Sequence, residues 1–90
     1  MPQRHVNVGS SVGLHARPAT LFVQAVAKQG VPVTIGRPGD DPVDARGILG
    51  VLGLGVKSGE EVVLSADGDG AETALDELAT LLATDLDAAA

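Results

Sequence analysis

A histidine, an arginine and a proline lie close together near the N-terminus, in the stretch Gly13-Leu14-His15-Ala16-Arg17-Pro18-Ala19-Thr20. An imidazole nitrogen can act as a nucleophile, and the fork of donors on a guanidinium matches phosphate oxygens. Proline is tolerated only in the first turn of a helix, so Pro18 predicts a helix that begins near His15. Free amides at a helix start carry partial positive charge and bind dianionic phosphate. The spacing therefore predicts a phosphoryl-acceptor site with His15 as nucleophile and Ala16, Arg17 and Pro18 around the phosphate.

The residues alone leave a second interpretation of this stretch. A single histidine near a helix start is commonly a capping or surface residue, and a single arginine is commonly a solvated charge. The nucleophile, the amides and the counter-charge come from one short stretch, as phosphate chemistry requires, but the residues alone favour the plainer role.

Other motifs in the chain are weaker. Residues 50–58 resemble a phosphate-binding loop, but Val56 interrupts the Gly-Lys-Ser core that such a loop needs. Residues 67–69 begin like a calcium loop, whose later ligand positions are filled by residues without side-chain oxygens, such as Ala71. We expect His5 to lie on the surface of a strand. The sequence thus predicts neither a metal site nor a cofactor.

Composition narrows the class of protein. The chain has 90 residues, 12 acidic and 6 basic side chains, a formal net charge of −6 and no cysteine. Scattered basic residues without aromatic neighbours are not typical of nucleic-acid binding, and the missing cysteines exclude disulfides. No apolar run is long enough to cross a membrane, and the N-terminus lacks the apolar core of a signal peptide. We expect one domain over residues 1–90, cytoplasmic, without membrane insertion, and monomeric.

The hydrophobic pattern places these features on secondary-structure elements. Helices are expected over residues 16–29, with Gly30 as C-cap, over residues 47–54, and from Ala71 along a stripe that reaches Leu86. Asp69 and Glu72 are expected to cap the last helix, and residues 85–90 to fray. Strands are expected over residues 5–8, 31–35, 43–45 and 60–66.

The order β-α-β-β-α-β-α predicts an α+β fold. We expect a two-layer open-faced sandwich in which three helices cover one face of a four-stranded, mainly antiparallel sheet.

The stretch from Gly13 to Ala19 resembles the active-site signature of the HPr family, the histidine phosphocarriers of the bacterial phosphotransferase system. Residues 48–55 resemble the second helix of that family, and residues 59–68 resemble its last strand and turn. The resemblance implies that His15 is phosphorylated by enzyme I, with phosphoenolpyruvate as donor. It also implies delivery to IIA domains of sugar permeases by a carrier that is not an enzyme.

One position departs from the family. Many members have a serine at the start of the second helix, and a regulatory kinase phosphorylates it. The matching residue here is Gly47, which has no hydroxyl. We therefore expect no kinase regulation at this position.

The second helix is expected to form part of a docking surface. It carries more apolar side chains than a short helix can bury, and we expect Leu49 and Leu52 in particular to be exposed. The expected docking surface beside His15 comprises Thr20, Leu21, Gln24, Ile48, Leu49 and Leu52. The alternative is that these side chains all belong to the core, and the resemblance to the HPr family favours docking.

Two alternatives to a sugar-linked carrier stay open from the sequence. One is a regulatory module that keeps the fold and signals by docking, and the presence of both His15 and Arg17 weighs against it. The other is a carrier in a nitrogen-related or kinase-linked phosphorelay.

Overall fold

The structure, a computed structural model of the chain, describes residues 2–84. Its elements are β1 Gln3–Asn7, α1 Ala16–Gln29, β2 Val33–Gly36, β3 Val43–Asp44, α2 Ile48–Gly53, β4 Glu61–Ala66 and α3 Ala71–Ala83. Order and type agree with the sequence prediction, and the boundaries move by one or two residues, except that α3 ends at Ala83 although the predicted stripe reaches Leu86. The fraying expected of residues 85–90, and the last residue of the predicted stripe, Leu86, lie outside the described residues.

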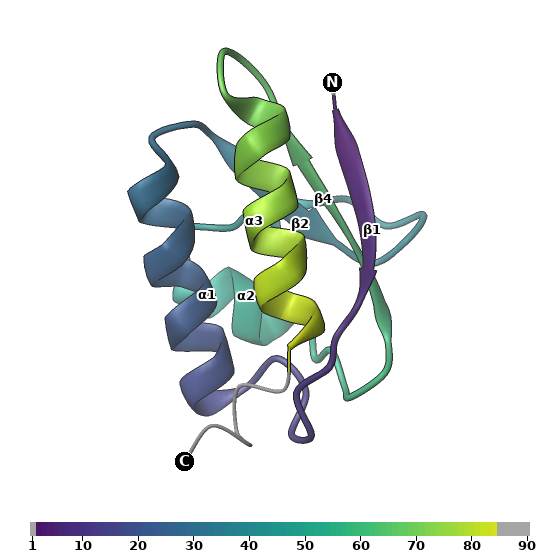
Figure 1. Cartoon of the computed structure of the whole chain (residues 1–90). Helices are drawn as coiled ribbons and strands as arrows, with labels where there is room; N and C mark the ends of the chain where they lie inside the picture. Colours follow the sequence, from purple (N-terminus) through teal and green to yellow (C-terminus); the bar gives the residue numbers. More distant parts are fainter. Residues whose placement is uncertain (1, 85–90) are drawn as a thin grey trace.

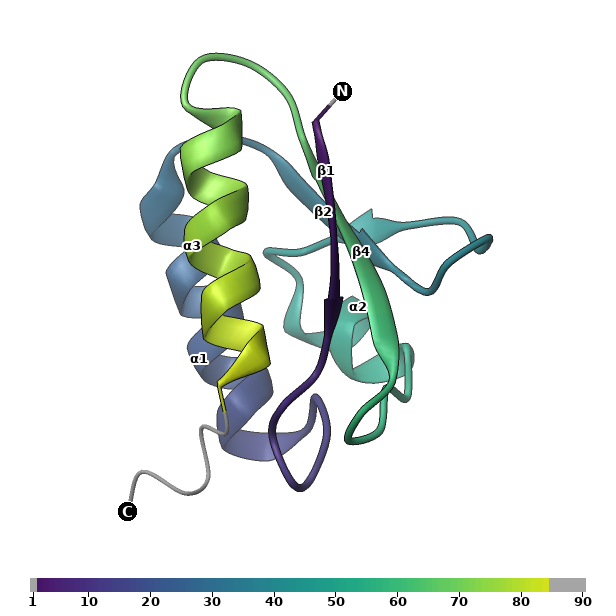
Figure 2. The same cartoon turned by 45° about the vertical axis from the view of Figure 1, so that its right-hand side comes forward.

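The four strands form one antiparallel sheet in the order β1-β4-β2-β3. In the centre, β4 pairs with β1, where Val6 faces Val62, and with β2, where Ile35 faces Leu64. Helices α1 and α3 lie side by side against one face of this sheet, and α2 packs against α1 and β3 (Figures 1 and 2). The predicted α+β open-faced sandwich is confirmed.

The core lies between the sheet and the helices, and aliphatic side chains dominate it. Alternation along the strands turns every second residue toward the helices, as expected for a sheet with one buried face. The largest fully buried side chains are Leu14, Phe22, Ile35, Leu64, Leu75, Leu78 and Leu82. The predicted stripes of α1 and α3 supply most of them.

Both ends of α1 agree with the prediction. Pro18 is buried in the first turn, and Gly30 is the C-cap, with a φ of 75°. That left-handed conformation suits glycine because it has no Cβ.

The capping prediction for α3 is wrong. Gly70 precedes the helix with a φ of 84°, and no side chain caps the first turn. Backbone carbonyls take this role, because Ala71 N donates to Gly68 O at 3.2 Å and Ala74 N donates to Gly70 O at 3.0 Å. Two left-handed glycines, Gly68 and Gly70, bring the chain into the helix through a tight turn. Asp69 is consequently one residue too early to cap α3.

Candidate functional site

His15 is the N-cap residue of α1, as predicted. Its backbone is extended, with φ −129° and ψ 166°, and its side chain makes no capping hydrogen bond. The residue is exposed, and its ring has no hydrogen-bond partner among residues 2–84. The imidazole is therefore not used to stabilise the helix and is open to a reagent from solvent.

The first turn of α1 leaves two backbone amides available beside this ring. The first backbone hydrogen bond of the turn joins Ala19 N to His15 O at 3.4 Å. Pro18 is buried and has no N–H, so its contribution to the turn is conformational. The amides of Ala16 and Arg17 have no partner within the described part of the chain. Unpaired amides at a helix start are able to bind an anion.

Backbone strain is present at the same place. Ala16 has a φ of +46°, the only positive φ of a non-glycine residue in residues 2–84. A left-handed alanine costs about 1–2 kcal/mol, and strain of this kind is concentrated at functional sites. The left-handed residue directly follows the histidine.

Arg17 differs from the other arginines of the described residues. Arg4 pairs with Asp76, Arg37 with Glu60 and Arg46 with Asp44. Arg17 is exposed and forms no ion pair or side-chain hydrogen bond with any residue from 2 to 84. Its guanidinium is thus open to an incoming anion.

The residues just before His15 pack against the segment that follows α2. Leu14 is fully buried, and its amide donates to Val56 O at 3.0 Å. Gly13 has a φ of 73°, and a Cβ at this position would collide with the Val56 carbonyl and the Lys57 backbone. The backbone of Gly13 and Leu14 therefore packs against the backbone of residues 56–57. This contact determines where α1 begins.

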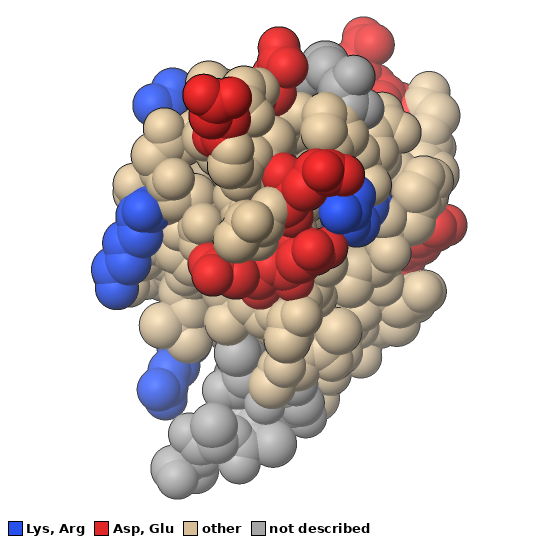
Figure 3. Space-filling view, turned by 45° about the horizontal axis from the view of Figure 1, so that its top comes forward, with Lys and Arg blue, Asp and Glu red and all other residues tan. Residues whose placement is uncertain are grey.

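Negative charge is concentrated away from this helix start. No Asp or Glu occurs before Asp40 in the sequence. Carboxylates gather instead around the beginning of α3, at the end of the molecule opposite the N-terminus of α1 (Figures 1 and 3). Within residues 2–84, no carboxylate forms an ion pair with His15 or Arg17.

The expected docking residues lie on two helices that pack against each other, α1 and α2. Leu49 is 83% exposed and Ile48 is 37% exposed. Thr20 and Gln24 are exposed and Leu21 is half-buried. The exposure expected of Leu49 is confirmed.

Leu52 differs from the prediction. It is half-buried and packs against the core cluster. A helix as short as α2 cannot expose every apolar side chain, because one of its faces packs against the core. Val51, next to Leu52, is fully buried.

Sequence reasoning missed an apolar residue in the loop before His15. Val12 is 50% exposed. The available signal was its position among Gly9, Ser10, Ser11 and Gly13, where no helix or strand can bury it.

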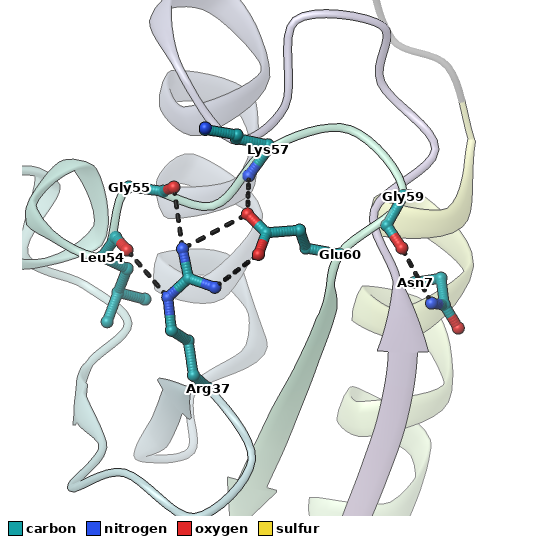
Figure 4. A network of polar contacts seen from close by, with 7 residues as sticks. All are labelled: Asn7, Arg37, Leu54, Gly55, Lys57, Gly59 and Glu60. Atoms are coloured by element: carbon teal, nitrogen blue, oxygen red, sulfur yellow. Dashed lines mark hydrogen bonds and ion pairs between the residues drawn. The ribbon is translucent and has the colours of Figure 1, made fainter.

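It also missed the network around Arg37, at the end of β2 (Figure 4). The guanidinium binds both oxygens of Glu60, with Nη1 to Oε2 at 2.7 Å and Nη2 to Oε1 at 3.3 Å. Its Nε and Nη2 also donate to the carbonyls of Leu54 and Gly55 at 3.1 and 2.9 Å. The hydrogen bonds from Arg37, followed by that from the Lys57 amide, lower the pKa of Glu60 to about 2. The residues are far apart in sequence, so no local pattern predicts this network.

A hollow of about 240 Å³ lies elsewhere, on the open face of the sheet. Its lining includes His5, Asp40 and Ser65 but neither His15 nor Arg17. No group of three or more His, Cys, Asp or Glu side chains in residues 2–84 is arranged to hold a metal ion. The candidate site is therefore an exposed surface rather than a pocket.

Comparison with known proteins agrees with this geometry. Residues 2–84 match the family model described as the PTS HPr component phosphorylation site. The chain belongs to the HPr family. It is 54% identical over 87 residues to the phosphocarrier protein HPr of Streptomyces coelicolor, covering 97% of this chain and 94% of that relative. Its role as a phosphocarrier of the phosphotransferase system follows from this membership.

Solved HPr structures share the fold. An HPr crystal structure from Thermoanaerobacter tengcongensis superimposes with a TM-score of 0.84 at 38% identity, over 91% of each chain. An HPr dimer from the same organism gives a TM-score of 0.68 at 38% identity, over 90% of this chain and 92% of the other. A family member can therefore dimerise, and the monomer expected for this chain stays a prediction. Within residues 2–84, no helix has the length and apolar character needed to span a membrane.

Proposed function

We propose that this HPr-family chain carries a phosphoryl group on His15, accepting it from enzyme I and delivering it to IIA domains of sugar permeases. The proposal rests on two features of the same helix start. The His15 imidazole is exposed, and Arg17 is the arginine that has no carboxylate partner in residues 2–84. Family membership supports the choice of donor and acceptor proteins.

The proposed transfer is a substitution at phosphorus. A lone pair on an unprotonated ring nitrogen of His15 forms the N–P bond while the bond between phosphorus and the donor protein breaks. The amides of Ala16 and Arg17 and the Arg17 guanidinium stabilise the negative oxygens of the group in flight and after transfer. When a IIA domain accepts the group, the N–P bond to His15 breaks while a nucleophile of the acceptor bonds to phosphorus, and the lone pair returns to the His15 nitrogen.

Partner docking is proposed to use the exposed apolar surface of α1 and α2. Leu49 and Ile48 supply its exposed apolar side chains, with Leu21 and Leu52 at its half-buried base and Thr20 and Gln24 at its polar edge. Exposed apolar side chains that lie together are typical of a protein-binding surface.

Incubation with enzyme I and phosphoenolpyruvate, followed by intact mass spectrometry, tests the proposal. We expect one acid-labile phosphoryl group on the natural chain and none on His15→Ala. Because His15 is exposed, the variant should fold normally, which circular dichroism can check. A phosphoryl group that persists on folded His15→Ala would refute the assignment. A natural chain that docks with partners but is never phosphorylated would favour a binding module.

A further inference from the structure

The Arg37 network joins two loops, the β2–β3 connection and the α2–β4 connection, rather than filling the core. Arg37 opens the β2–β3 connection, Leu54 and Gly55 follow α2, and Glu60 directly precedes β4. Glu60 Oε1 also accepts the Lys57 amide at 2.7 Å. One guanidinium thus holds both ends of the segment from residue 54 to residue 60, which we call the bridge segment.

The bridge segment in turn supports the loop that carries His15. Val56 O accepts the Leu14 amide, and Gly13 lies against the backbone of residues 56–57 with no room for a side chain. At its far end, Gly59 N donates to Val8 O at 2.8 Å and Val8 N donates to Glu60 O at 3.0 Å. Residues 8–14 are therefore attached to the bridge segment at both ends.

The bridge segment also continues directly from α2, which presents Leu49. The two carbonyls that Arg37 binds lie just beyond the C-terminus of α2. Short helices have little stability of their own, so contacts at their ends largely determine their position. The proposed docking helix and the acceptor loop are hence held by the same segment, and that segment is held by Arg37.

We propose that Arg37 is a positioning residue for phosphoryl transfer, which acts through the bridge segment to hold α2 and the His15 loop in the arrangement that partner proteins recognise. The proposal rests on the function proposed above for His15. Arg37 does not touch the phosphoryl group in this role. Its planar fork binds one carboxylate and two carbonyls together, a geometry that lysine cannot reproduce.

Steady-state transfer from phosphorylated enzyme I to Arg37→Gln tests the proposal. Loosening the docking arrangement should raise KM about tenfold, the factor that corresponds to one hydrogen bond to a charged group. The kcat should change by less than about twofold, because His15 and Arg17 are intact. Partial unfolding would also raise the apparent KM, because the variant is the substrate in this assay and only its folded fraction is recognised. Circular dichroism gives that fraction, and KM is calculated from the concentration of folded protein. Arg37→Lys should fall between the natural chain and Arg37→Gln.

Hydrogen exchange supplies a readout that does not depend on phosphorylation. The Leu14 amide should exchange faster in Arg37→Gln, because its acceptor Val56 O is no longer held in place. Amides that join β1 to β4 should keep their protection. If His15 proves not to be the acceptor, this measurement still tests the positioning role.

Arg4→Gln is the matched control. Arg4 Nε pairs with Asp76 Oδ1 at 2.8 Å and joins β1 to α3, without contact to α2 or the bridge segment. This variant also loses an arginine–carboxylate pair and one positive charge, and it should leave KM and Leu14 exchange unchanged.

Glu60→Gln gives an independent variant, should Arg37→Gln not fold. It removes the carboxylate but leaves the bonds from Arg37 to Leu54 and Gly55 possible, so we expect a smaller rise in KM. An unchanged KM together with unchanged Leu14 exchange in folded Arg37→Gln or Glu60→Gln would overturn the proposal. An equal KM rise in Arg4→Gln would attribute the effect to net charge and overturn it too.

Discussion

Leu49 offers a sharp test of the docking surface, because its position separates binding from stability. It is 83% exposed on α2, while its neighbour Val51 on the same helix is fully buried. Replacing Leu49 by glutamate should weaken partner binding and leave folding nearly unchanged. Replacing Val51 by alanine should do the reverse.

The expected stability changes follow from burial. Full burial of a leucine is worth about 1.5–3 kcal/mol, so the 17% of Leu49 that is buried contributes about 0.3–0.5 kcal/mol. A carboxylate in the first turn of α2 regains about 0.3 kcal/mol from the helix dipole. The net change for Leu49→Glu is therefore close to zero. Val51→Ala removes two buried methyl groups and should cost at least about 1.5 kcal/mol.

The effect on binding should be much larger than the effect on folding. If a partner covers Leu49 completely, losing that contact raises Kd or KM by roughly ten- to a hundredfold. Urea unfolding measures the free energy of unfolding, and transfer from phosphorylated enzyme I measures KM. Leu49→Gln separates loss of apolar contact from added charge, and it should retain most of the binding defect.

Two results would refute this reasoning about Leu49. A loss of several kcal/mol in the free energy of unfolding would place the side chain inside the protein. Unchanged KM in a stable Leu49→Glu variant would show that partners dock elsewhere.

Four further predictions concern Arg17, Gly47 and Glu60. Arg17→Lys should retain the fold and slow phosphoryl transfer, because lysine keeps the charge and loses the fork; unchanged rates in both directions would make Arg17 a plain surface charge. Gly47→Ser should be neutral or more stable by a few tenths of a kcal/mol, about what a serine cap adds over glycine. The backbone there is extended and an added Cβ lies 3.6 Å from Asp44 O, so a loss above about 1 kcal/mol in urea unfolding would contradict this. The natural chain, with Gly47, should not be modified by a serine kinase of the HPr type, and phosphoserine anywhere in it would show either that the α2 alignment is wrong or that another serine is a regulatory site. For Glu60, the folded-state pKa of about 2 lies below the ordinary 4.5, so its ionised form stabilises the fold above about pH 4.5 and that contribution is lost toward pH 2. The stability difference between the natural chain and Glu60→Gln should shrink over this window, and a difference independent of pH would contradict the network.

The sequence alone predicted the fold class and the position of His15 at a helix start. Both depend on local signals. Alternating valines indicate strands, and a stripe at helical spacing ended by Gly30 indicates α1. Pro18 limits where that helix can begin, because proline cannot lie farther inside it. The exposure of Leu49 was also predictable, since a short helix has only one face to bury.

Local signals also misled where glycine determined the backbone. Asp69 and Glu72 have the spacing of a capping pair, yet Gly68 and Gly70 adopt left-handed conformations that move the helix start past Asp69. The backbone carbonyls of this turn then accept the first amides, and the carboxylate is not needed.

Only the tertiary structure decided which charges remain available and what supports the site. Each of Arg4, Arg17 and Arg37 is the same residue type in the sequence, but folding brings Asp76 to the first and Glu60 to the third. Arg17 keeps its guanidinium open because its helix start meets no carboxylate among residues 2–84. Contacts of this kind join residues distant in the chain, so they depend on strand order and loop packing, which no local pattern of residues specifies.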